Sequence, residues 1–157
     1  MIFDDLVIGF ISGAHEQGVE MIMVGGGAVN FHGYQRHSAD VDFWIKTSSD
    51  NMSKLLKVLN NMSYEIDEFP KEVVEGNQNI SVKISPYQEL ELITNFNPGK
   101  TFDEAFKDAE TGEIEGYRLA VYKVLSLDDL IMSKAKSKRS KDLLDIMELQ
   151  RINKNKT

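Results

Sequence analysis

The amino-acid sequence predicts one domain of the α/β (α+β) class, in which helices flank a mixed β-sheet. Several segments carry short or alternating apolar runs of strand length, and the segments between them carry apolar residues at helical spacing. The length of 157 residues fits a single domain. We therefore expect one domain over residues 1–157, with a C-terminal helical pair at 126–152 packed on it.

Composition excludes several classes of protein. Hydrophobic residues make up 41% and charged residues 27%, as in a globular protein, and there is no cysteine to form disulfides, thiolate nucleophiles or Cys-bound zinc. The first ten residues, MIFDDLVIGF, carry acids where a signal peptide carries basic residues. No apolar run approaches the roughly 18 residues that a membrane span needs. We expect a cytoplasmic protein without a membrane partner.

The net charge of -7 is unevenly distributed along the chain. Residues 1–132 hold 10 basic and 22 acidic side chains, whereas residues 133–157 hold 8 basic and 3 acidic ones. A polyanion, if one binds, would therefore meet the C-terminal end. A solvated helix face is the alternative explanation of this basic end.

The first part of the chain alternates helices and strands. We expect helices at 4–18, at 28–31 and from 49 to about 62, and strands at 21–24 and 40–45. Gly18 is suited to end the first helix, and Ser49 or Asp50 to cap the third. In the strand at 40–45, Val41 and Phe43 share one side, and the acidic residues share the other.

The second part of the chain is expected to complete the sheet and to end in helices. Strands are predicted at 64–69, 80–85 and 89–95, with one or two more within 117–124, and a helix at 101–109. Ser126 and Asp129 resemble a capping box, which opens a helix through about 138. Ser140 can cap a last helix, whose apolar residues are Leu143, Leu144, Ile146, Met147 and Leu149.

Three successive glycines, Gly25, Gly26 and Gly27, follow the predicted strand at 21–24. Without side chains, they let the backbone approach a ligand closely. A helix that starts there would direct free N–H groups at an anion. The spacing matches neither a Walker loop nor the dinucleotide-binding pattern. A tight turn without a ligand explains the triplet equally well.

Two aspartates, Asp40 and Asp42, lie two residues apart on a predicted strand, so both carboxylates point to the same face. Like charges at roughly 6–7 Å repel each other unless a cation or solvent separates them. Mg²⁺ takes oxygen ligands, usually one or two carboxylates plus substrate phosphates. Arg36 and Ser38 precede the pair and add a phosphate-binding cation and a hydroxyl. The alternative is a solvated acidic sheet face.

The order Gly-Gly, short helix, Gly33 and then Arg36-x-Ser38-x-Asp40-x-Asp42 resembles the nucleotidyltransferase superfamily of DNA polymerase β-like enzymes. The resemblance implies a minimal nucleotidyltransferase fold. It implies that the glycine motif, together with Arg36 and Ser38, holds the triphosphate of an NTP. It also implies that Asp40 and Asp42 bind Mg²⁺ or Mn²⁺, with a third carboxylate from a neighbouring strand.

Two further stretches resemble the ends of small bacterial nucleotidyltransferase-like proteins, which are related to the toxin component of abortive-infection (AbiEii-type) toxin–antitoxin systems. They are Leu127-Asp-Asp-Leu-Ile-Met-Ser-Lys134 and Arg139-Ser-Lys-Asp142-Leu-Leu-Asp145. By this resemblance Lys134 contacts substrate phosphate, and Asp142, at a helix start, orients Arg139 or Lys134. The alternative is that Lys134 is one more solvated lysine.

The third carboxylate is expected at Glu91, where the superfamily tends to have an aspartate before two aliphatic residues; the glutamate side chain is one methylene longer. Glu89 shares its strand face with Glu91, so the sequence leaves both open as catalytic and metal-binding residues. Exposed strand glutamates without a function are the alternative.

The resemblance implies transfer of a nucleoside monophosphate from an NTP to an acceptor by a two-metal mechanism. The acceptor, an RNA end, a protein hydroxyl or a small molecule, is not revealed by the sequence. A catalytically silent nucleotide- or partner-binding module, with a cognate antitoxin or a second copy as its partner, is the alternative. A third hypothesis is a structural protein with a solvated acidic face.

Overall fold

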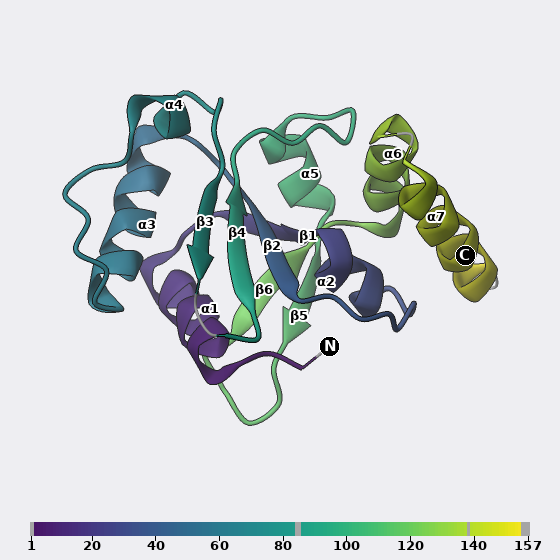
Figure 1. Cartoon of the computed structure of the whole chain (residues 1–157), viewed down its shortest axis with the longest axis horizontal. Helices are drawn as coiled ribbons and strands as arrows, with labels where there is room; N and C mark the ends of the chain where they lie inside the picture. Colours follow the sequence, from purple (N-terminus) through teal and green to yellow (C-terminus); the bar gives the residue numbers. More distant parts are fainter. Residues whose placement is uncertain (1, 84–85, 138, 155–157) are drawn as a thin grey trace.

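The computed structural model describes residues 2–83, 86–137 and 139–154, and six of its strands form one sheet in the order β3-β4-β2-β1-β6-β5 (Figure 1). The strands are β1 (Met21–Val24), β2 (Asp40–Ile45), β3 (Ile80–Lys83), β4 (Glu89–Ile93), β5 (Glu110–Glu113) and β6 (Val121–Val124). The helices are α1 (Asp5–Gln17), α2 (Gly25–Phe31), α3 (Ser49–Asn61), α4 (Lys71–Val74), α5 (Phe102–Asp108), α6 (Leu127–Ser137) and α7 (Ser140–Asn153).

The sheet is mixed. Strand β1 pairs antiparallel with β2 and parallel with β6, and β2 pairs parallel with β4. The outer strands β3 and β5 each add to the sheet in antiparallel fashion. Together with the helices around the sheet, this arrangement confirms the fold class predicted from the sequence.

Helix α1 packs on the sheet beside α3 and supplies part of the core (Figure 1). Its buried residues include Val7, Phe10 and Ile11, whereas Leu6 is 53% exposed. Gly18 ends the helix with φ 71°, a left-handed conformation that favours glycine. Along the described parts of the chain, no helix is long and apolar enough to cross a membrane.

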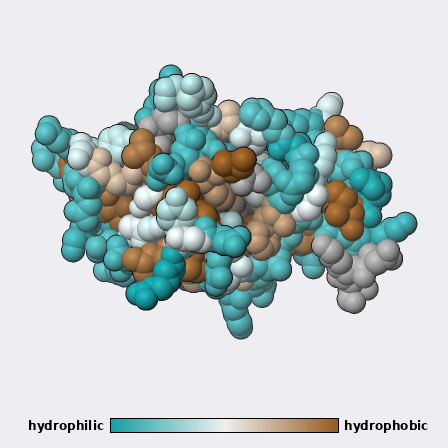
Figure 2. All heavy atoms as spheres, turned by 90° about the horizontal axis from the view of Figure 1, so that it is seen from below, coloured by the Kyte–Doolittle hydropathy of each residue, from teal (hydrophilic) through white to brown (hydrophobic). Residues whose placement is uncertain are grey.

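Helices α6 and α7 lie side by side at one end of the molecule, beyond α2 (Figure 1). The face that α7 buries is largely polar, because Asp142 and Asp145 are among its four buried residues. The apolar residues Leu143, Leu144 and Met147 are 52%, 53% and 66% exposed. Figure 2 shows hydrophobic atoms on the surface at this end. Helix α7 is therefore held to the body mainly through polar groups.

One predicted strand is wrong: residues 64–69 form an irregular segment. Asn60 binds both backbone groups of Ile66, since its Nδ2 donates to the Ile66 carbonyl at 2.9 Å and its Oδ1 accepts from the Ile66 N–H at 2.9 Å. These are the groups that a neighbouring strand would need. Tyr64 and Ile66 still pack against the core, which explains their apolar character.

Two short elements escaped prediction. Strand β5, with the sequence ETGE, has no apolar residue to mark it, and α4 is a single turn after Pro70. The N-cap of α3 is Ser48, one residue before the expected position. The predicted strand end at 84–85 and the predicted helix end at 138 lie outside the described residues.

Candidate active site

A cavity of about 710 Å³ opens where the ends of β1 and β2 meet α6 and α7. Eight of the ten predicted site residues line it: Gly25, Gly26, Arg36, Ser38, Asp40, Asp42, Lys134 and Asp142. The other two, Gly27 and Glu91, are not part of its lining. The fold thus brings residues from three distant segments to one place.

Gly25, Gly26 and Gly27, here called the glycine loop, form the first turn of α2, which begins three residues before the predicted helix at 28–31. Gly25 and Gly26 pack tightly against β2 and the segment before it because Val24, the last residue of β1, pairs with Asp42. Gly25 has φ 61°, and a Cβ on it would collide with the Asp42 carboxylate. A Cβ on Gly26 would lie 2.6 Å from the Cβ of Ser38. Only glycine fits at these two positions, one for its conformation and both for lack of space. Gly27 instead faces Met23, so its role there is packing.

Asn30 holds the loop after α2 in place. Its Nδ2 donates to the carbonyl of Gly26 and to the carbonyl of Arg36, both at 3.0 Å. These bonds tie the backbone of Gly26 to the backbone of Arg36, and both residues line the cavity. Sequence reasoning missed Asn30; the signal was a polar residue at a position where a short buried helix needs apolar ones.

Asp40 and Asp42 project from β2 beside the parallel strand β4, whose register places Glu89 next to Asp40 and Glu91 next to Asp42. Burial raises the pKa of Asp42 to about 6, and the negative charges of Asp40 and Glu91 add to this effect. No salt bridge engages either aspartate within the described residues. Asp42 is therefore an unpaired, poorly solvated acid in the cavity wall.

This register bears on which glutamate is the third carboxylate. Glu91 lies beside Asp42, and its negative charge raises the pKa of Asp42, whereas Glu89 lies beside Asp40. Its carboxylate accepts a hydrogen bond of 2.6 Å from the Ser81 hydroxyl on β3. Among residues 2–83, 86–137 and 139–154, no three His, Asp or Glu side chains are grouped as ligands of one metal ion. Of the three carboxylates that line the cavity, Asp40 and Asp42 have no ion pair within the described residues. Two carboxylates suit Mg²⁺ when substrate phosphates supply further oxygens.

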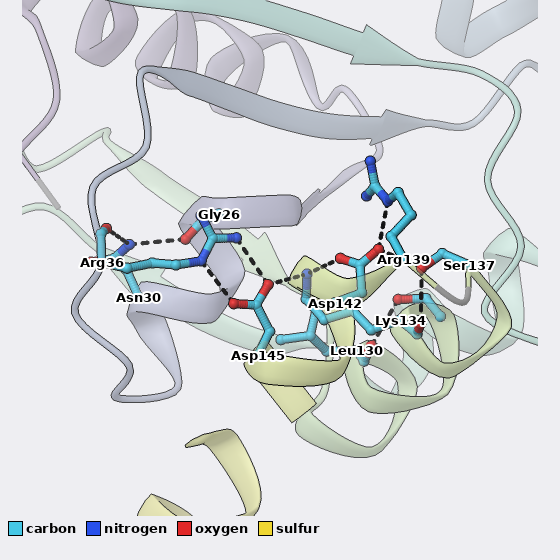
Figure 3. Close-up of polar contacts among 10 residues, drawn as sticks. Gly26, Asn30, Arg36, Leu130, Lys134, Ser137, Arg139, Asp142 and Asp145 are labelled. Atoms are coloured by element: carbon cyan, nitrogen blue, oxygen red, sulfur yellow. Dashed lines mark hydrogen bonds and ion pairs between the residues drawn. The ribbon is translucent and has the colours of Figure 1, made fainter. Parts of the chain in front are cut away.

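Asp145 joins the two cations that the sequence assigned to phosphate binding (Figure 3). Its carboxylate accepts from Nε and Nη2 of Arg36 at 2.9 and 3.0 Å, and from Nζ of Lys134 at 2.9 Å. Asp145 is only 1% exposed. Sequence reasoning assigned it no role; the available signal was its position three residues after Asp142, which places both on one face of α7.

Asp142 lies at the start of α7 and accepts from three donors (Figure 3). Lys134 Nζ lies at 3.2 Å, Arg139 Nε at 2.6 Å, and the hydroxyl of Ser137 also donates to it. Burial opposes ionisation, but the hydrogen bonds from Ser137, Arg139 and Lys134 outweigh it and hold the pKa of Asp142 at about 2. Asp142 thus contacts both residues that it was expected to orient.

The comparison with protein families agrees with this geometry. The family described as nucleotidyl transferase of unknown function (DUF2204) matches residues 5–157, nearly the whole chain. The chain belongs to this family. No curated protein matches it. Membership of a nucleotidyl transferase family supports the superfamily resemblance, and it does not single out the branch related to abortive-infection toxins.

In this nucleotidyl transferase family member, both paired cations keep a donor for a ligand. Arg36 uses Nε and Nη2 for Asp145, while Nη1 lies near Gly26, 3.7 Å from where a Cβ would be. The ammonium of Lys134 has three hydrogens and two carboxylate partners. Lys136 and Lys141 add exposed positive charge to the cavity lining.

The C-terminal end of α7 is anchored where α2 ends. Asn153 Nδ2 donates to the carbonyl of His32 at 2.9 Å, and His32 Nε2 donates to the carbonyl of Leu125 at 2.8 Å. Gly33, at φ 109°, allows close approach, since a Cβ there would lie 2.9 Å from Ile152. These contacts hold the end of α7 against the end of α2, and the ion pair between Arg36 and Asp145 joins the same two parts of the chain.

Proposed function

We propose that this protein transfers a nucleoside monophosphate from an NTP to an acceptor hydroxyl or phosphate. The acceptor oxygen forms a bond to the α-phosphorus, the bond to pyrophosphate breaks, and a hydroxyl acceptor releases its proton. The observation that carries the proposal is the shared cavity, in which a glycine loop, an aspartate pair and a buried lysine come together. Family membership supports the same reaction class.

The chain's own residues supply the binding surface for the triphosphate. Gly25 and Gly26 leave the backbone open, and the Ser38 hydroxyl lies beside Gly26. Arg36 Nη1 and the third hydrogen of Lys134 offer charge-assisted hydrogen bonds to phosphate oxygens. Because Asp145 already fixes both cations, little side-chain order has to be gained when the nucleotide binds.

Asp40 and Asp42 fit a divalent cation by their chemistry. They are oxygen donors without a protein cation as partner in the described residues, whereas the neighbouring Asp142 has three hydrogen-bond donors. Mg²⁺ or Mn²⁺, when bound there, neutralises phosphate charge and lowers the pKa of the attacking oxygen. Glu91 is the expected third carboxylate; the Ser81 hydroxyl occupies its Oε2, so Oε1 is the oxygen that would bind the cation.

The first test measures binding by thermal unfolding with each of the four NTPs and Mg²⁺. A ligand at 100 times its Kd adds about 2.7 kcal/mol, which corresponds to about 5–10 °C for a domain of this size. Asp40→Asn and Asp42→Asn should lose this shift, while Asp50→Asn, whose side chain is 82% exposed and outside the cavity, should keep it. No shift with any NTP would contradict the proposal.

The second test follows the reaction itself. The protein is incubated with labelled NTP, Mg²⁺ or Mn²⁺ and cell extract, and the label is sought in RNA, protein and small molecules. The alternative is a catalytically silent nucleotide-binding module, a component of a toxin–antitoxin pair. NTP binding without any labelled product would support that alternative.

A further inference from the structure

The cavity also has a part lined by side-chain amides, which the proposed phosphate site does not use. Three asparagines, Asn79, Asn95 and Asn97, line it and are here called the amide wall. They come from the segment before β3 and the segment after β4, which are neighbouring strands. Ile93, at the end of β4, and Phe96, after it, also line the cavity, so none of the described lining residues that β4 and these two segments contribute carries a charge.

Two amides of the wall have a fixed orientation. The Asn79 side-chain oxygen accepts from the backbone N–H of Thr94 at 2.9 Å, and the Asn97 side-chain oxygen accepts from the N–H of Gly99 at 2.8 Å. A backbone N–H requires an acceptor, so the oxygen of each amide must face the protein. The Nδ2 groups have no further partner within the described residues. The wall therefore offers hydrogen-bond donors to a ligand.

Phe96 gives this part of the cavity a firm apolar surface. Its ring packs against Trp44 at 5.1 Å between centroids, and Trp44 packs against Phe102 at 5.1 Å. Trp44 is itself only 5% exposed, so it is buried packing and not a stacking surface for a ligand. A ligand that fits here has an apolar face and hydrogen-bond acceptors at its edge.

We propose that the amide wall binds the base of the nucleotide and prefers bases that carry a carbonyl oxygen, namely uracil, cytosine and guanine, to adenine. The proposal rests on the proposed function, which places the triphosphate at the charged part of the same cavity. Uracil, cytosine and guanine present carbonyl oxygens to the Nδ2 donors of Asn79 and Asn97. Adenine has no carbonyl oxygen, so only its ring nitrogens can accept from these donors, and its amino group would face them as an unmatched donor.

The test is calorimetric titration of the protein with Mg²⁺ complexes of tripolyphosphate, ATP, UTP, CTP and GTP. Tripolyphosphate probes the charged part alone. We expect UTP, CTP and GTP to bind more tightly than tripolyphosphate, and ATP to bind about tenfold more weakly than UTP, which is the effect of one or two unmatched hydrogen bonds.

A variant isolates the donors of the wall. Asn79→Asp keeps an acceptor for the Thr94 N–H and replaces the donors by a carboxylate oxygen. The ratio of UTP to tripolyphosphate affinity should fall about tenfold, and the preference for UTP over ATP should disappear. Asn77→Asp is the matched control, since it adds the same charge two residues away outside the cavity lining and should leave both ratios unchanged.

The outcomes separate the two proposals. If none of the five compounds binds, the proposed function fails, and the base site fails with it. If tripolyphosphate and all NTPs bind equally, or if ATP binds most tightly, the base site is overturned and the proposed function stands. Equal weakening of all five compounds by Asn79→Asp would also overturn the base site, because charge alone would then explain the effect.

Discussion

Arg36 and Asp145 form a two-point ion pair between segments that lie 109 residues apart in the sequence. The guanidinium follows α2 and the carboxylate lies on α7, so the pair joins the glycine-loop side of the cavity to the C-terminal helices. The apolar residues Leu143, Leu144 and Met147 face away from this contact. The cavity wall that α7 provides is thus positioned by charge and hydrogen bonds.

Asp145→Asn should destabilise the fold and weaken nucleotide binding together. The change removes the negative charge that balances Arg36 and Lys134. Both side chains are largely buried, so water cannot solvate their charges in its place. Breaking one partner of a buried ion pair costs about 3 kcal/mol. Urea unfolding measures the first effect, and titration with Mg²⁺–NTP below the unfolding range measures the second.

Glu148→Gln is the matched control for this prediction. Glu148 pairs with Arg151 on the same helix at 2.8 Å, but the arginine side chain is 66% exposed. Exposed pairs contribute little to stability because water solvates both partners once the pair is broken. Equal losses of stability in Asp145→Asn and Glu148→Gln would show that the buried ion pairs of Asp145 stabilise the fold no more than the exposed pair of Glu148 does.

Gly26→Ala should lose stability and NTP affinity because its new Cβ meets Ser38. The two Cβ atoms would lie at 2.6 Å, so one of the two segments has to move. Overpacking of this kind costs about 1–3 kcal/mol. Ser38→Gly in the same chain removes the obstacle and should restore much of the stability. Thermal unfolding of the single and double variants tests this coupling.

Gly9→Ala is the control for the glycine loop. Apart from its chain neighbours and the backbone of its own helix, no atom lies within 4 Å of the position that its Cβ would take, and Gly9 lies inside α1. Alanine in a helix interior is better than glycine by about 0.5–1 kcal/mol, so this variant should be more stable than the wild type. A loss of stability in Gly9→Ala comparable to that in Gly26→Ala would contradict the steric argument.

The metal-free protein should lose stability as the pH rises from about 4 to about 6. Burial and the charges of Asp40 and Glu91 raise the pKa of Asp42 to about 6 from its ordinary 3.8, although Lys134 and Lys141 act in the opposite direction. In this range the unfolded chain has released the proton that folded Asp42 still holds, so unfolding becomes easier. Urea midpoints at several pH values in EDTA measure the trend.

Asp42→Asn should remove this part of the pH dependence. Above pH 6 the variant should be more stable than the wild type, and near pH 4 the two should be alike, because wild-type Asp42 is then protonated. Asp142 acts in the opposite direction, because its lowered pKa of about 2 stabilises the folded state above pH 4. This contribution is the same in the wild type and in Asp42→Asn, so it cancels in the comparison. Parallel pH curves for the two proteins would contradict the assignment.

Lys134→Ala should reduce NTP affinity about tenfold, the effect of losing one hydrogen bond to a charged group. Lys134 is 7% exposed and lines the cavity, whereas Lys154 is exposed and lies outside it. Lys154→Ala should leave NTP affinity unchanged. Titrations at two salt concentrations distinguish the causes, because a diffuse charge effect would be small, similar in both variants and absent at high salt.

The sequence determined the features that depend on neighbouring residues. The apolar run before three glycines predicted β1, and the alternation around Asp40 and Asp42 predicted β2 with its acidic face. Cap residues and helical spacing located α1, α3, α6 and α7 to within a few residues. These patterns are local, since periodicity and capping involve residues within one or two turns.

Only the tertiary structure decided which distant groups meet. The parallel register of β2 and β4 placed Glu91 beside Asp42, and the docking of α7 placed Asp145 between Arg36 and Lys134. A periodic pattern identifies the faces of a strand or helix and not the partner of each face. The energy that selects the partner comes from burial and pairing of charges, which exist only once the segments are together.

The same reason explains the wrong strand at 64–69 and the unexpected orientation of α7. Apolar residues at 64–69 predicted a strand, but the side chain of Asn60 took the backbone groups of Ile66. In α7, three of the five apolar residues named from the sequence are exposed, whereas Asp142 and Asp145 are buried and bound by cations from other segments. The sequence determines the local preference of each segment for helix or strand. The folded chain determines which groups pair, because hydrogen bonds and ion pairs between segments far apart in the sequence outweigh that local preference.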